Sequence, residues 1–174
     1  LKPIESYLQQ INAIKNLDGL AKVFATTGFS SPVGGWVDVD SKDTENYIFY
    51  VTQSGLGLPD RDTYLTDKGK NAETRDGYLN YLTVLLGEAG YADAGAAASR
   101  VLALETEIAK AHWDRTVGRN RNLTYNKMTR TELIGLGGDF PVATMLEAFN
   151  LADQENFVVR QVNPDASETE SLGL

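Results

Sequence analysis

Few residues in this chain could carry catalytic chemistry. His112 is its only histidine, and the sequence contains no cysteine. Cysteine nucleophiles, thiolate metal sites and disulfides are therefore excluded. A catalytic zinc usually takes three protein ligands, most of them His or Cys, so these 174 residues cannot supply such a site by themselves. We predict no catalytic, cofactor-binding or metal-binding residue within this sequence.

The remaining chemical motifs are weak. His112 is expected near the end of a long helix, where a ring packs or interacts with the helix C-terminus. Gly55-Leu56-Gly57 lacks the third glycine of a dinucleotide-binding loop, because Asp60 stands at that position. With 24 Asp and Glu, carboxylate pairs are abundant, so a small carboxylate-based hydrolase stays open as an alternative.

Charge and hydropathy narrow the class of protein further. The 16 Lys and Arg against 24 Asp and Glu give a net charge of −8, which argues against binding a phosphate backbone. One basic group is interpreted as a solvated linker that pairs with the excess carboxylates: Arg115, Arg119, Arg121 and Lys127. No apolar run approaches the ~20 residues that span a bilayer. The start has no Met and no signal-peptide pattern, so we expect a piece of a longer protein.

The elements that would position these residues are mostly helical. Two long helices are predicted over 71–89 and 93–115, joined by a short turn as an antiparallel pair. Period-2 patterning predicts a β-hairpin over 36–53. The fold class is therefore mainly α (α+β), a helical bundle with one long antiparallel helix pair and one small β-hairpin.

Shorter elements complete this expectation. Helical periodicity occupies 3–16, and Asp18 is a candidate cap for the next helix. Thr129 and Glu132 match a capping box ahead of a further helix, and 157–161 is a short strand candidate.

The stretch 53–65 is the most distinctive. Its glycines permit tight backbone geometry, and Asp60 or Asp62 is expected to cap the following turn. Arg61 is expected to be held by carboxylate or backbone acceptors. From its residues alone, this stretch is a structural corner.

The same stretch carries a resemblance to a known family. The segment Gln53-Ser54-Gly55-Leu56-Gly57-Leu58-Pro59-Asp60-Arg61-Asp62-Thr63-Tyr64-Leu65 resembles a signature of the N-terminal region of neprilysin-like zinc metallopeptidases. Other segments are similar to that family in matching order: 38–43 with Tyr47-Ile48, 104–111, and Tyr125-Asn126-Lys127-Met128-Thr129. Together they cover about residues 36–132.

The resemblance implies a function that this sequence does not carry alone. The family's zinc is held by H-E-x-x-H and a downstream glutamate in the C-terminal half of a much longer protein, and that motif is absent here. Residues 1–174 are then a single fragment of the non-catalytic N-terminal region, which caps the active-site chamber and restricts substrate size, with 166–174 as a flexible tail. The parent would be a zinc endopeptidase that hydrolyses oligopeptides.

The resemblance also implies partners and a location. The catalytic zinc half of the same polypeptide is the expected partner, with peptide substrates bound through the parent. Family members from vertebrates contain disulfides, so a chain without Cys fits a bacterial member exported to the periplasm or cell surface. The alternative function, which is not enzymatic, is that of a stand-alone helical protein-binding module.

Overall fold

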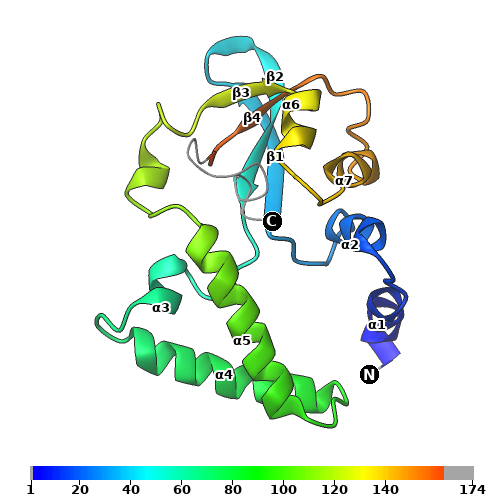
Figure 1. The fold of residues 1–174 in the computed structure, drawn as a ribbon, viewed down its shortest axis with the longest axis vertical. Coiled ribbons are helices and arrows are strands. Elements are labelled where there is room, and N and C mark those ends of the chain that lie inside the picture. The colour runs from blue at the N-terminus through cyan, green and yellow to red at the C-terminus, as the bar shows by residue number, and fades with distance from the viewer. Residues whose placement is uncertain (1, 163–174) are drawn as a thin grey trace. The chain divides into compact units, whose positions relative to one another are not determined.

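The computed structural model describes residues 2–162, which form two compact units. The first unit is Leu1–Ser54 with Thr116–Leu174, and the second is Gly55–Arg115. Figure 1 labels the strands and α-helices of both units; all of the strands belong to the first unit. The predicted tail at 166–174 lies outside the described residues.

A four-stranded mixed sheet forms the centre of the first unit. Its strands are β1 (Val33–Asp40), β2 (Asp43–Gln53), β3 (Asn126–Thr129) and β4 (Asn156–Val159), in the order β1-β2-β4-β3. β1 and β2 form the expected antiparallel hairpin, β4 joins β2 in parallel, and β3 joins β4 in antiparallel orientation.

The expectation of one small hairpin is therefore corrected. The hairpin is half of a larger sheet, whose other strands have only four residues each. Asn126–Thr129 lies in a polar segment that lacks an alternating apolar pattern, so only pairing with β4 makes it a strand. The coarse α+β class holds, while a helical bundle does not describe this unit.

Three helices cover one face of this sheet: α2 (Leu17–Phe24), α6 (Arg130–Gly135) and α7 (Val142–Ala148). α1 (Glu5–Asn12) precedes α2 and has no buried residue, and short 3-10 helices lie at Lys2–Ile4 and Val117–Arg119. The main core joins α2, α6 and α7 to β2 and β4 through buried side chains: Ala21, Val51, Leu133, Val142, Met145, Leu146, Phe157 and Val159. Burial of this apolar surface supplies the main driving force for folding the unit.

One predicted helix cap is confirmed, and another is formed by a different residue. The capping box is confirmed, because the Thr129 hydroxyl accepts from the Glu132 N–H while Glu132 accepts from the Thr129 N–H. The cap of α2 is Asn16, whose Oδ1 accepts from the Gly19 N–H at 2.9 Å. Asp18 instead accepts a hydrogen bond from the Thr144 hydroxyl of α7.

The second unit contains α3 (Arg61–Leu65), α4 (Asn71–Glu88) and α5 (Ala94–Ala111). α4 and α5 have 18 residues each and cross one another in Figure 1; their antiparallel pairing stays a prediction. α5 ends four residues before the predicted 115, because the backbone at His112 is extended with ψ 143°. A small core holds the unit together through Leu58, Tyr64 and Ala109.

Candidate functional site

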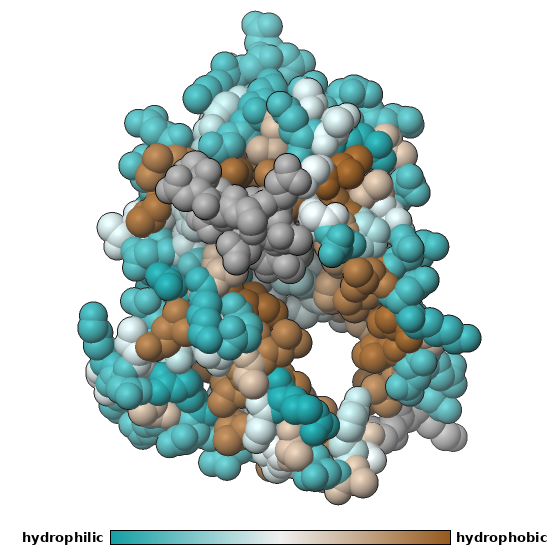
Figure 2. Space-filling view, in the orientation of Figure 1, coloured by the Kyte–Doolittle hydropathy of each residue, from teal (hydrophilic) through white to brown (hydrophobic). Residues whose placement is uncertain are grey.

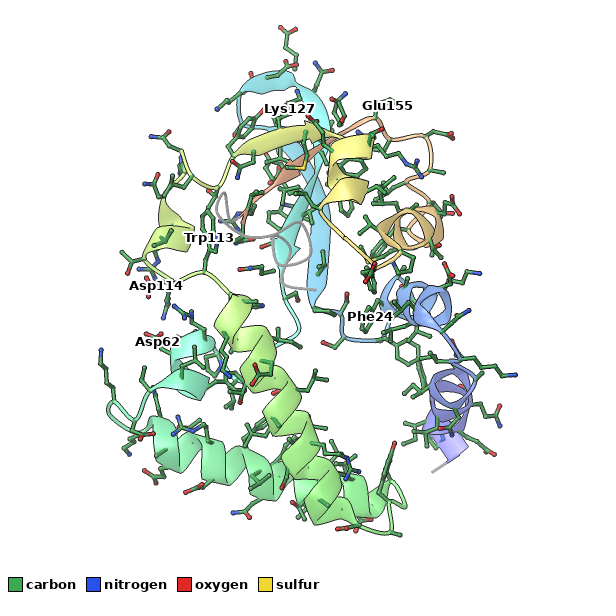
Figure 3. All side chains as sticks on the ribbon, viewed as in Figure 1. Phe24, Asp62, Trp113, Asp114, Lys127 and Glu155 are labelled. Carbon is green, nitrogen blue, oxygen red and sulfur yellow. The ribbon has the colours of Figure 1, made fainter. Side chains whose placement is uncertain are left out.

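The first polar cluster is built around Asp40 at the end of β1. Its side chain is 1% exposed, and Oδ1 accepts from the Tyr125 hydroxyl at 2.7 Å and from the Lys42 N–H at 2.9 Å. Lys127 donates to Oδ2 at 2.9 Å from β3, where Figure 3 labels it. The sheet topology brings Tyr125 and Lys127 to Asp40 from more than 80 residues away in sequence.

These contacts set the protonation state of Asp40. Burial would raise the pKa of its carboxyl, but the hydrogen bonds from Tyr125, Lys127 and Lys42 lower that pKa to about 2. Burial and the hydrogen bond to Asp40 raise the pKa of the Tyr125 phenol well above its ordinary value. Asp40 is therefore a fixed carboxylate at neutral pH, and Tyr125 remains a hydrogen-bond donor.

The second polar cluster is built around Glu105 on α5. Tyr64 donates to its Oε2 at 2.6 Å, and Tyr78 donates to its Oε1 at 3.0 Å. The Tyr64 oxygen in turn accepts from the Leu58 N–H at 2.8 Å, which ties the glycine-rich loop to α3 and α5. Burial, and then the hydrogen bond to Glu105, raise the pKa of Tyr78 to about 12 and move that of Tyr64 in the same direction.

Gly57 is required by this cluster. A Cβ at position 57 would overlap the Tyr78 hydroxyl and lie 2.7 Å from Cζ of the same ring. Because residue 57 has no side chain, the loop backbone can lie against the Tyr78 hydroxyl without displacing it from Glu105. This explains one glycine of the distinctive stretch without any nucleotide.

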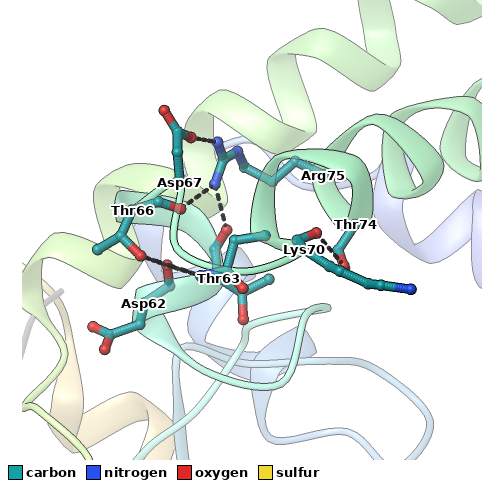
Figure 4. Close-up of polar contacts among 8 residues, drawn as sticks. Asp62, Thr63, Thr66, Asp67, Lys70, Thr74 and Arg75 are labelled. Carbon is teal, nitrogen blue, oxygen red and sulfur yellow. Dashed lines mark hydrogen bonds and ion pairs between the residues drawn. The ribbon is translucent and has the colours of Figure 1, made fainter.

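The loop between α3 and α4 is held by arginine. As predicted, the Asp60 side chain caps α3, since its Oδ1 accepts from the Thr63 N–H at 3.1 Å. Arg61 meets a backbone acceptor, because its Nε donates to the Ala109 carbonyl at 3.4 Å. Arg75, which the sequence did not single out, donates to the Thr63 and Thr66 carbonyls at 2.8 Å each and pairs with Asp67 (Figure 4).

The remaining candidates from the sequence do not gather in one site. His112 is the C-cap of α5, and its N–H donates to the Ile108 and Ala109 carbonyls. Lys127 is one of the four basic residues assigned to a linker, but it lies in β3 and pairs with Asp40. Among residues 2–162, no group of three or more His, Cys, Asp or Glu side chains could hold a metal ion.

Several groups in these clusters have pKa values moved away from neutral pH. A general acid or base works best with a pKa near the working pH, whereas the pKa of Asp40 is lowered to about 2 and that of Tyr78 is raised to about 12. Both carboxylates already accept two or three hydrogen bonds. We call the Asp40 and Glu105 clusters the two polar anchors of the chain.

Residues 1–167 match the N-terminal family model described as peptidase family M13. The chain therefore belongs to this family of neprilysin-like metallopeptidases. The two anchors also explain the resemblance seen in the sequence: segments 38–43 and 125–129 meet at Asp40, and segments 53–65 and 104–111 meet at Glu105.

Individual relatives agree with this assignment. Endothelin-converting enzyme 1 from Cavia porcellus and from Homo sapiens are each 38% identical over 101 residues, covering 56% of this chain and 13% of theirs. The Mycobacterium tuberculosis zinc metalloprotease Zmp1, solved with an inhibitor, is 29% identical with a TM-score of 0.86, over 99% of this chain and 26% of that one. PepO from Lactobacillus rhamnosis, at 13% identity and a TM-score of 0.70 over 91% of this chain and 26% of that one, shares the fold.

The chain thus spans only a small part of the relatives it matches. No helix within residues 2–162 has the length and apolar character needed to cross a bilayer.

Proposed function

We propose that this chain is the structural and substrate-gating N-terminal region of a zinc metalloendopeptidase that hydrolyses oligopeptides. The main support is the match of residues 1–167 to the N-terminal model of a peptidase family. The structural relative Zmp1 is about four times longer than this chain. The zinc and its ligands would then belong to the catalytic half of the same polypeptide. The catalytic step itself is not carried by these 174 residues.

The two polar anchors support the structural part of this proposal. Each fixes a loop to distant secondary structure by charge-assisted hydrogen bonds, which are stronger than neutral ones. Such loops keep a defined shape, as a wall that excludes large substrates must do.

The activity test compares the full-length protein with the 174-residue chain on a fluorogenic oligopeptide. We expect chelator-sensitive turnover, restored by zinc, from the full-length protein alone. Chelator-sensitive turnover by the purified 174-residue chain would overturn the proposal. A full-length reading frame without H-E-x-x-H would instead favour the stand-alone binding module.

The gating test uses peptides of increasing length with the full-length enzyme. We expect Glu105→Gln, which weakens the anchor beneath the glycine-rich loop, to reduce the preference for short over long substrates. The control is Glu107→Gln, at an exposed glutamate of the same helix that pairs with Lys110. An unchanged length preference in both variants would contradict a gating role for the second unit.

The localisation that goes with this function is the periplasm or cell surface, in line with the family resemblance. Fractionation of cells expressing the full-length gene tests it. Recovery of the protein in the cytoplasm alone would contradict it.

A further inference from the structure

β1 is an edge strand of the sheet. Within residues 2–162 it pairs with β2 on one side only. Five consecutive residues of this strand, 35–39, are exposed, and the Val37 side chain is 63% exposed. An exposed edge of this kind presents backbone donors and acceptors that can pair with another extended segment.

The register decides which backbone groups point outward. Ser54 N–H donates to the Pro32 carbonyl at 2.8 Å, so the hydrogen-bonded pairs of the hairpin fall on even positions of β1. On the other side of β2, the Val51 carbonyl accepts from the Arg160 N–H, which places the odd positions of β2 toward β4. Both observations agree that the N–H and C=O groups of Gly35 and Val37 point away from β2.

Among residues 2–162, side-chain contacts close this edge at both ends but not in the middle. At one end the Val33 N–H donates to the Ser31 hydroxyl at 3.2 Å. At the other end, next to a β-bulge, the Val39 N–H donates to Asp38 at 2.8 Å and the Val39 carbonyl accepts from the Tyr50 hydroxyl. Gly35 and Val37 lie between these closures as one repeat of an antiparallel ladder.

An open groove begins where this edge is free. It has a volume of about 450 Å³ and is lined on one side by Gly34 and Gly35. Its other walls mix aromatic side chains, Phe24, Phe29 and Phe149, with polar ones such as Thr26, Ser30 and Asn150. Figure 2 shows apolar side chains over the segment that follows α2 and along α1, and Figure 3 labels Phe24 at the end of α2. Strand addition combines backbone pairing with pockets for side chains, and this edge has outward backbone groups beside one groove.

We propose that an extended segment of the longer peptidase polypeptide, from outside residues 1–174, adds to β1 as a fifth strand. This segment would pair with Gly35 and Val37 and place one side chain in the groove, against its aromatic and hydroxyl-bearing walls. We choose this occupant because much of the related polypeptide lies outside these residues: the structural match covers 99% of this chain but only 26% of Zmp1. This inference rests on the proposed function, because it needs a parent polypeptide.

Asp38 adds a charge preference. It is exposed, next to Val37, and a basic residue on the added strand would face it favourably. A second copy of this chain would bring another acidic edge and a net charge of −8, so we favour the parent segment over self-pairing.

Hydrogen exchange tests this pairing. Amide exchange of Gly35 and Val37 is measured by mass spectrometry with residue-level fragmentation, in the full-length protein and in the 174-residue chain. We expect exchange at both amides to be at least about tenfold slower in the full-length protein, as for amides in a formed ladder. The amides of Phe157–Val159, which lie in β4 inside the sheet, are the control for intact folding in both samples.

Two variants of the full-length protein sharpen the test. Val37→Pro deletes one outward N–H without removing a bond to β2, so the Gly35 amide should lose its protection. Val37→Thr keeps the N–H and the strand propensity, so its Gly35 amide should stay protected.

Several outcomes would overturn the proposal. Equal exchange rates at Gly35 and Val37 in the two proteins would show a free edge. Protection already present in the 174-residue chain would assign the cover to this chain itself, or to a second copy if it grows with concentration. Zinc-dependent turnover is measured on the same full-length sample: an active enzyme with a free edge refutes the added strand alone, and an inactive one with a protected edge refutes the proposed function alone.

Discussion

At the scale of single residues, two carboxylates stabilise the fold by accepting several hydrogen bonds each. Asp40 is buried and accepts hydrogen bonds from two side chains and one backbone N–H. Breaking a buried, hydrogen-bonded charge leaves its partners unsatisfied, which costs more than the net contribution of an ordinary hydrogen bond. The same contacts make the stability of the sheet depend on pH.

Asp40 should contribute to acid sensitivity. Its folded-state pKa of about 2 lies below the ordinary 3.8, so its ionised form is favoured by folding. The resulting stabilisation of about 2 kcal/mol is complete above pH ~4 and is lost as pH falls toward 2. Asp40→Asn should therefore lower the free energy of unfolding by about that amount at pH 7, and by much less at pH 2.

Urea unfolding at both pH values measures this difference. Asp153→Asn, at an exposed position outside the helices and strands, is the control and should leave the unfolding free energy nearly unchanged. An equal loss for Asp40→Asn at pH 7 and pH 2 would show that packing, and not ionisation, accounts for the role of Asp40.

Gly57 is a second position where one residue decides local structure. Gly57→Ala should destabilise the second unit by about 1–3 kcal/mol, because the new methyl group would overlap the hydroxyl of the half-buried Tyr78, which donates to Glu105. Gly77→Ala is the matched control in α4, where a Cβ meets nothing within 4 Å. That substitution should stabilise the helix by roughly 0.5–1 kcal/mol. Thermal melts that rank the two variants in the opposite order would contradict this explanation of Gly57.

At the scale of elements, arginines fix the turn between α3 and α4. Arg75→Ala should lower the free energy of unfolding by about 1–3 kcal/mol, since two loop carbonyls lose a charged donor. Arg61→Ala should cost less, about 1 kcal/mol, because its bond to the Ala109 carbonyl is long at 3.4 Å. Asp67→Ala should change little, as its side chain is 81% exposed.

Chemical denaturation of the three variants measures their free energies of unfolding and so tests this ranking. Arg75→Lys serves as a further control, because lysine keeps the charge but cannot reproduce the planar set of donors. If Asp67→Ala costs as much as Arg75→Ala, the ion pair rather than the carbonyl contacts would stabilise the turn.

At the scale of the whole molecule, the two units have separate cores. Glu105→Gln weakens the anchor of Gly55–Arg115, so it should speed amide exchange in α4 and α5 by several-fold. Exchange at Phe157–Val159 in the sheet should be unchanged, as expected when cooperative units open separately. Glu107→Gln should leave both regions as they were. Equal acceleration in both regions for Glu105→Gln would mean that the chain opens as one unit.

Much of the fold follows from local sequence. The capping box at Thr129, the Asp60 cap, the strands of the hairpin and the two long helices depend on neighbours a few residues apart, and all lie near their predicted positions. The sequence also identified the family, because four short segments matched it in order. One histidine and no cysteine predict that this chain alone holds no catalytic zinc, and this stays a prediction.

Tertiary structure decided the rest. β3 has no strand pattern of its own, and it forms only because β4 offers a partner. Asn16 instead of Asp18 caps α2, since Asp18 accepts from Thr144, which is 126 residues away. Asp40 and Glu105 could not be singled out among 24 acidic residues, because what distinguishes them is burial beside tyrosines from distant segments. Such long-range pairings leave no periodicity in the sequence, and only the folded chain brings these residues together.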